Sequence, residues 1–142
     1  MIPSPDEVAF AWAKDNNQTI LPTRADAANV LGLSTQVPAR MVYYTDGETE
    51  TRRIGPWNIE FVHAGKEITG LRGKMASLVV LALYYIGQDW TTSATIKKIL
   101  LVLTRMDSDD LVRCIDDLEY NIQLAPLWMK PVIRDIIDAQ SP

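Results

Sequence analysis

The side chains that could perform catalysis are few and widely separated. His63 is the only histidine and Cys114 the only cysteine in the 142 residues. A cysteine nucleophile needs a base within hydrogen-bonding reach. The alternating pattern around His63 predicts a strand, however, whereas Cys114 falls on the apolar face of a predicted helix. One histidine and one cysteine are also too few for the usual transition-metal sites. We therefore expect no catalytic residue and no bound metal.

Acidic pairs and glycines provide the remaining chemical possibilities. The aspartate pairs at 109–110 and 116–117 could bind Mg²⁺, but no basic, phosphate-binding segment accompanies them. Their places at the start and on the outer face of a predicted helix are typical of dipole stabilisation and solvation. The glycines at 65, 70 and 73 lack the Lys-Ser or Lys-Thr pair of a phosphate-binding loop. The sequence thus predicts a protein that is not an enzyme and uses no cofactor.

One loop favours a binding role. Residues 32–40 join a predicted helix to a predicted strand and carry four polar side chains. The loop can serve to cap the helix and fix the strand's entry, or it can form a recognition surface, because binding sites are often loops held by rigid elements. One of the two tyrosines at 43 and 44 must face away from the core, and an exposed tyrosine beside Arg40 suits protein contact. The candidate partner-binding residues are Ser34, Thr35, Gln36, Arg40 and Tyr44.

Helix signals surround these residues on both sides. Ser4 and Glu7 form a capping box with Pro5 in the first helical position, and the polar residues 15–17 end that helix. A short extended piece at 19–21 precedes a second helix over 23–31. A glycine-punctuated loop over 65–73 follows the strands. Apolar spacing then predicts a helical C-terminal part, with helices over 74–86 and 92–106, from 108, and from about 126 onward.

Three short runs in the middle of the chain have strand character. Residues 41–45, 49–54 and 59–63 are separated by turn signals at Asp46-Gly47 and Gly55-Pro56. Strands and helices are thus segregated, which indicates the α+β class. We expect a small antiparallel three-stranded meander, with a short extra strand, packed against an N-terminal helix pair and a C-terminal helical cluster. The absence of any linker or repeat predicts a single domain over residues 1–142.

Composition and charge limit the partners. Apolar residues make up 47% of the chain, charged residues 23%, and the net charge is −4, which is typical of a folded soluble protein. The apolar stretch over 75–86 is too short to cross a membrane, and no secretion signal opens the sequence. With one cysteine, the cytoplasm is the expected location. The acidic balance disfavours nucleic-acid binding by the whole surface. Four arginines could still form an auxiliary phosphate surface if they converge on one face: Arg24, Arg40, Arg52 and Arg53.

A long part of the sequence resembles a known family. The segment over 22–47, and within it Gly32-Leu33-Ser34-Thr35-Gln36-Val37-Pro38, resembles the AbiEi-type antitoxins of bacterial abortive-infection systems. The resemblance continues through Ile59-Glu60-Phe61 and through Gly73-Lys74 at the start of an apolar helix. It ends at Leu124-Ala125-Pro126-Leu127-Trp128, where the family often has alanine in place of Leu127.

The resemblance implies a function. It implies a non-catalytic antitoxin domain, part of a toxin–antitoxin system, that counteracts a nucleotidyltransferase-like toxin. Family members usually carry an N-terminal winged helix-turn-helix that binds operator DNA and represses their own operon. Residues 4–7 look like the start of the C-terminal domain, so we expect that module to be absent. The alternative is a DNA-associated autorepressor acting with a separate winged-helix module. The positions matched for recognition are Ser34, Thr35, Gln36 and Arg40.

Overall fold

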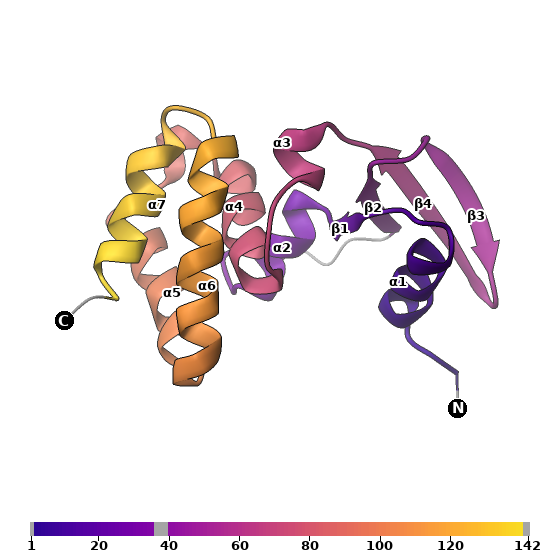
Figure 1. The fold of residues 1–142 in the computed structure, drawn as a ribbon, viewed down its shortest axis with the longest axis horizontal. Coiled ribbons are helices and arrows are strands. Elements are labelled where there is room, and N and C mark those ends of the chain that lie inside the picture. The colour runs from indigo at the N-terminus through magenta and orange to yellow at the C-terminus, as the bar shows by residue number, and fades with distance from the viewer. Residues whose placement is uncertain (1, 36–39, 141–142) are drawn as a thin grey trace. The chain divides into compact units, whose positions relative to one another are not determined.

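A computed structural model of the chain describes residues 2–35 and 40–140 (Figure 1). Its contacts divide the chain into two compact units. The first, here called the sheet unit, comprises residues 1–23 and 38–70, and the second, the helical unit, comprises residues 24–37 and 71–142. The expectation of a single domain stays a prediction.

The α+β class is confirmed: the strands all lie in the sheet unit, and a group of helices forms the helical unit. The sheet unit contains the helices α1 (Pro5–Asp15) and α3 (Lys66–Thr69). Its four strands are β1 (Ile20–Pro22), β2 (Met41–Thr45), β3 (Glu50–Ile54) and β4 (Trp57–His63). The helix α3 falls in the segment 65–73 that the sequence predicted to be a loop.

The strand order corrects the predicted meander. The sheet has the order β1-β2-β4-β3, and β2 pairs with β4 in parallel, with Tyr43 opposite Phe61. A two-residue turn joins β3 to β4 as an antiparallel hairpin, and the positive φ of Gly55 (58°) suits this turn. The three strands are therefore not a simple antiparallel meander. The charged strand β3 takes the edge, where charges discourage pairing with other chains, and the apolar β4 takes an interior place.

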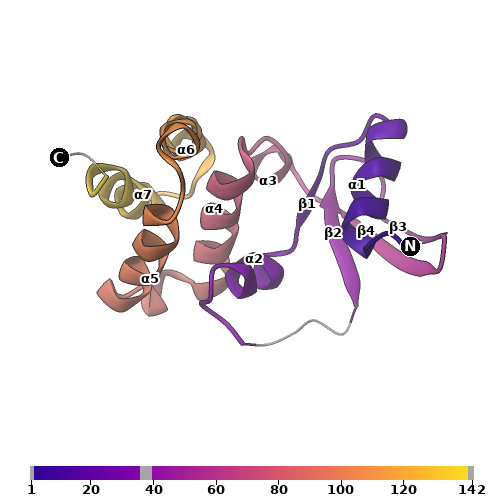
Figure 2. The same cartoon turned by 90° about the horizontal axis from the view of Figure 1, so that it is seen from below.

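Helix α1 covers one face of this sheet (Figure 2). As predicted, Ser4 caps the helix, since its hydroxyl accepts a hydrogen bond from the backbone N–H of Glu7 at 3.2 Å. Under the helix, the Trp12 and Phe61 rings stack with their centroids 4.7 Å apart. The buried core beneath α1 consists of Ala9, Ala13, Ile20, Tyr43, Ile59 and Phe61. Packing of these side chains fixes which face of each strand points away from α1.

The helical unit is built around one almost fully buried helix, α4 (Lys74–Ile86). Beside α4 lie α2 (Arg24–Val30) and α6 (Ser108–Asn121), and α7 (Met129–Asp138) packs against α6. The unit also contains α5 (Ser93–Thr104) and two single-turn helices, η1 (Gln88–Trp90) and η2 (Ile122–Leu124). Of the predicted N-terminal helix pair, α1 covers the sheet within the sheet unit, and α2 packs on α4 within the helical unit. The small side chains of Ala27 and Ala28, both fully buried, allow that close approach.

Two polar contacts define local geometry within the helical unit. The side chain of Asn121 is fully buried and clasps the backbone of Arg72, accepting from its N–H at 2.8 Å and donating to its carbonyl at 3.0 Å. On the surface, Arg134 of α7 donates to both carboxylate oxygens of Glu119 at 2.7 and 2.9 Å. This bidentate pair lowers the pKa of Glu119 from its usual range.

Two helix starts differ from the sequence predictions. Asp107, not Ser108, caps α6, with its carboxylate accepting from the N–H of Asp110 at 2.9 Å. The last helix begins at Met129 rather than near Pro126, which places Pro131 in its first turn, where a missing N–H is tolerated. Among the described residues, every helix is too short or too polar to cross a membrane.

Candidate functional site

The face of the sheet that points away from α1 is the first candidate site. Successive strand residues alternate between faces. Tyr43 is buried and its hydroxyl donates to the carboxylate of Asp6 in α1, so the half-buried Tyr44 points to the opposite face. The register of β2, β3 and β4 then groups seven residues, which we call the outer face: Val42, Tyr44, Thr51, Arg53, Asn58, Glu60 and Val62. On β1, Leu21 stands opposite Tyr44 on the same side of the sheet and is buried.

The outer face combines an apolar strip with charges. Tyr44 stands opposite Val62, whose side chain is 37% exposed although it is large and apolar. Beside them, Arg40 forms an ion pair with Glu60, with Nη1 and Oε1 3.1 Å apart. Arg53 is exposed on the edge strand, and none of the ion pairs among the described residues includes it. An aromatic ring, an apolar contact and free or loosely paired arginines are typical of protein interfaces.

The predicted partner-binding residues fall into two groups. In the sheet unit, Arg40 pairs with Glu60 of β4, and Tyr44 stands opposite Val62, two residues further along the same strand. Ser34 is half-buried and Thr35 exposed, and both follow α2 in the helical unit. Gln36 lies outside the described residues. Of the loop residues that the structure describes, Arg40 is the one paired with the outer face, and a single continuous recognition loop stays a prediction.

The four arginines proposed for nucleic-acid contact do not form one group. Arg52 and Arg53 are adjacent in β3 and so point to opposite faces of the sheet. Arg52 forms an ion pair with Glu50, and its guanidinium lies 5.2 Å from the centroid of the Trp12 ring on the α1 face. Arg24 belongs to the helical unit, where its guanidinium lies 4.4 Å from the centroid of the Tyr84 ring.

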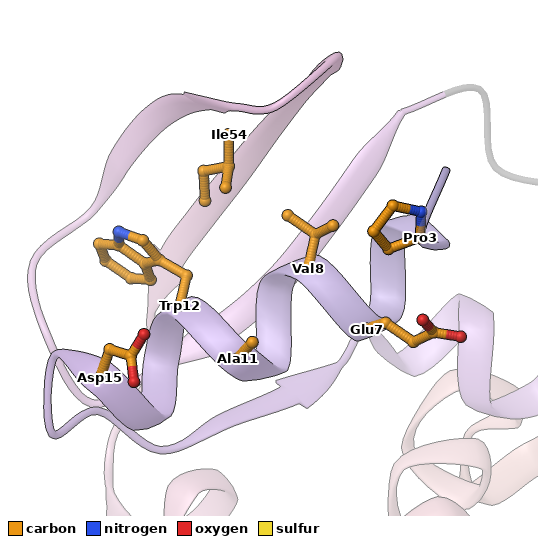
Figure 3. Close-up of a pocket in the computed structure, with 7 residues that line it drawn as sticks. All are labelled: Pro3, Glu7, Val8, Ala11, Trp12, Asp15 and Ile54. Carbon is orange, nitrogen blue, oxygen red and sulfur yellow. The ribbon is translucent and has the colours of Figure 1, made fainter. Parts of the chain in front are cut away.

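A shallow hollow beside α1 is the second candidate site (Figure 3). It encloses about 520 Å³ between the helix and the end of β3. Its lining is mainly apolar, with a carboxylate towards each end of the helix: Pro3, Glu7, Val8, Ala11, Trp12, Asp15 and Ile54. The carbonyl of Pro3 accepts a hydrogen bond from the Trp57 indole N–H at 3.2 Å, which holds this rim in place.

The residues considered for catalysis are held in structural roles. His63 lies at the end of β4, with Nδ1 2.8 Å from the carbonyl oxygen of Gly47. Burial, together with the charge of Asp117, raises the pKa of the Cys114 thiol to about 11. This environment favours the neutral thiol, whereas a nucleophile needs the thiolate. Within the described part of the chain, no three acidic, histidine or cysteine side chains cluster as metal ligands would.

Sequence reasoning missed several residues of both candidate sites. Alternation with the buried Ile59 and Phe61 could have placed Glu60 and Val62 on the outer face, but the parallel pairing of β4 with β2 gave no sequence signal. In the hollow, Glu7, Ala11 and Asp15 follow at helical spacing on α1. These three residues line a hollow only because Ile54, from a strand that is distant in sequence, lies beside them.

Together these features define a two-unit α+β protein that offers a partly exposed sheet face and an acidic-rimmed hollow as its candidate contact surfaces. Residues 1–111 match a family of unknown function, DUF6088, and the chain belongs to that family. No curated protein and no solved structure matches the chain.

Proposed function

We propose that the protein is a non-catalytic antitoxin or regulatory module that counteracts a nucleotidyltransferase-like toxin through protein contact. The observation that carries this proposal is the outer face of the sheet, where Tyr44 and Val62 adjoin the Arg40–Glu60 ion pair. The resemblance of residues 22–47 to AbiEi-type antitoxins indicates the kind of partner. Membership of DUF6088 indicates no partner, because the function of that family is unknown. Acting on such a toxin places the protein in the bacterial cytoplasm.

The chemistry of the outer face supports protein contact. Tyr44 can bury a rigid ring while its hydroxyl stays available for hydrogen bonding. Arg53 presents an exposed guanidinium at the edge of the same face. An acidic toxin surface would pair with Arg53, and the Arg40–Glu60 pair would set the orientation of the partner by charge complementarity.

The alternative, a DNA-associated autorepressor that works with a separate winged-helix module, has weaker support. Its phosphate surface requires several arginines on one face. Arg52 and Arg53 point to opposite faces, and Arg40 and Arg52 are both paired with glutamates. The protein would then bind operator DNA only through the separate module.

Growth rescue tests the proposal. The chain is co-expressed with a nucleotidyltransferase-like toxin of an abortive-infection system, and growth of the host is scored. The matched variants are Arg53→Glu on the outer face and Arg52→Glu, its neighbour on the α1 face. We expect rescue by the unmodified chain and by Arg52→Glu, and loss of rescue by Arg53→Glu.

Thermal melts of both variants confirm that they are folded. A folded, unmodified chain that fails to restore growth would overturn the antitoxin proposal. Equal rescue by the two arginine variants would instead remove the outer face from it.

A further inference from the structure

The hollow beside α1 has a regular arrangement of charge around an apolar floor. Glu7, Ala11 and Asp15 are each four residues apart on α1, so the two carboxylates are separated by about 12 Å along the helix axis. Ala11 stands midway between them, and its small side chain leaves the space that the hollow occupies. None of the seven residues that line the hollow is basic.

The apolar floor is rigidly supported. Trp12 stacks on the fully buried Phe61, with ring centroids 4.7 Å apart, so the indole has little freedom to fill the hollow. Figure 3 shows the Trp12, Val8 and Ile54 side chains converging on the space above α1, with Glu7 and Asp15 towards its two ends. The guanidinium of Arg52 lies over the Trp12 ring, but its charge is already matched by Glu50.

Another helix of the same chain has the complementary arrangement. On α5 and its C-cap, Lys97, Leu101 and Arg105 are also four residues apart, with all three side chains exposed. Leu101 is 57% exposed and stands midway between the two basic side chains. No residue from Ser93 to Met106 is acidic, and the ion pairs among the described residues include neither Lys97 nor Arg105.

We propose that the hollow of one copy of the protein receives the basic face of α5 from a second copy. Leu101 enters between Val8, Trp12 and Ile54, above Ala11. Lys97 and Arg105 then reach the two carboxylates, because both charge pairs have the same separation of about 12 Å. The contact joins different surfaces of the two copies, so it is heterologous. It is independent of the proposed antitoxin function, which uses the outer face.

Charge reversal in both partners tests this contact by sedimentation of the full chain at increasing concentration. One variant is Glu7→Lys with Asp15→Lys, and the other is Lys97→Glu with Arg105→Glu. Each variant alone would place like charges together, so we expect its self-association to weaken by about tenfold or more, as losing two exposed pairs and adding two repulsions implies. In an equimolar mixture, each reversed surface meets an oppositely charged partner, and association should return.

Two controls separate the contact from general effects. Leu101→Ala should weaken self-association, whereas Val112→Ala on α6, where the side chain is 59% exposed, should leave it unchanged. Asp116→Lys on α6 provides a charge change outside both surfaces. Restored association in the mixture cannot arise from misfolding of either variant. An unmodified chain that stays monomeric at all concentrations, or a mixture that associates no better than its components, would overturn the proposal.

Discussion

Replacing Asn121 should destabilise the helical unit more than any surface change nearby. Asn121→Ala removes the hydrogen bonds to the N–H and the carbonyl of Arg72. Among the described residues, only the Ser77 hydroxyl, at 3.3 Å, then still donates a hydrogen bond to that carbonyl. A backbone N–H left without its partner costs about 1–3 kcal/mol, and loss of a fully buried side chain adds to this. We expect a loss of about 2–3 kcal/mol in the free energy of unfolding, measured in urea, and a Tm lower by roughly 6–12 °C.

Two further variants make this expectation specific. Gln123→Ala changes an exposed side chain two residues away and should stay within about 0.5 kcal/mol of the unmodified chain. Asn121→Asp keeps the size and the acceptor but loses the donor. A buried carboxylate should therefore be at least as harmful at neutral pH, and stability should partly recover as acid protonates it. If Asn121→Ala and Gln123→Ala unfold at the same urea concentration, the hydrogen bonds between Asn121 and the backbone of Arg72 contribute nothing to the free energy of unfolding, which would refute this prediction.

Two other predictions concern Cys114 and the glycines. The pKa of Cys114 is about 11 in the folded protein, above its unfolded value of 9.0. The contribution of the neutral thiol to the free energy of unfolding is therefore complete below pH 9 and is lost as the pH rises towards 11. Unfolding titrations of Cys114→Ala at the same pH values should lack this loss. Gly73→Ala would place a methyl carbon against the carboxylate of Asp117 at a positive φ, whereas Gly32→Ala has a similar φ and open space around it. Backbone strain should lower the free energy of unfolding of both glycine variants by about 1–2 kcal/mol. Gly73→Ala should lose more than Gly32→Ala, and Asp117→Ala should relieve that additional loss. Equal losses of the two glycine variants in urea would show that the clash is absent.

Local signals in the sequence predicted most of the elements but not their arrangement. The capping box at Ser4 and Glu7 and the apolar spacing of α4 identified both helices, because caps and periodicity act within a few residues. The α+β class followed from the segregation of helices and strands. The parallel pairing of β2 with β4 could not be predicted, since it depends on which strands α1 covers. Which strands α1 covers is determined by the packing of Ile59 and Phe61 under the helix, and no local sequence pattern reports this packing.

The candidate sites were predicted only in part. Arg40 and Tyr44 were identified because a loop next to an aromatic strand is a common contact surface; Arg40 pairs with Glu60 and Tyr44 stands opposite Val62, and their role in binding stays a prediction. The arginines predicted to contact nucleic acid do not lie on one face, because Arg52 and Arg53 are adjacent in a strand and point to opposite faces of the sheet. The hollow was not predicted at all, because it needs Ile54 and Trp12, which are distant in sequence, to lie on the same side of the sheet.

The central claim, that the outer face of the sheet contacts the toxin, is tested most directly by calorimetric titration of the purified chain with the nucleotidyltransferase-like protein. Tyr44→Ala and Arg53→Glu are compared with Arg52→Glu, all three first shown to be folded. We expect the first two variants to bind at least about tenfold more weakly, as loss of an interface anchor implies, whereas Arg52→Glu should bind like the unmodified chain. Equal affinity of all three variants, or no binding by the unmodified chain, would contradict the claim.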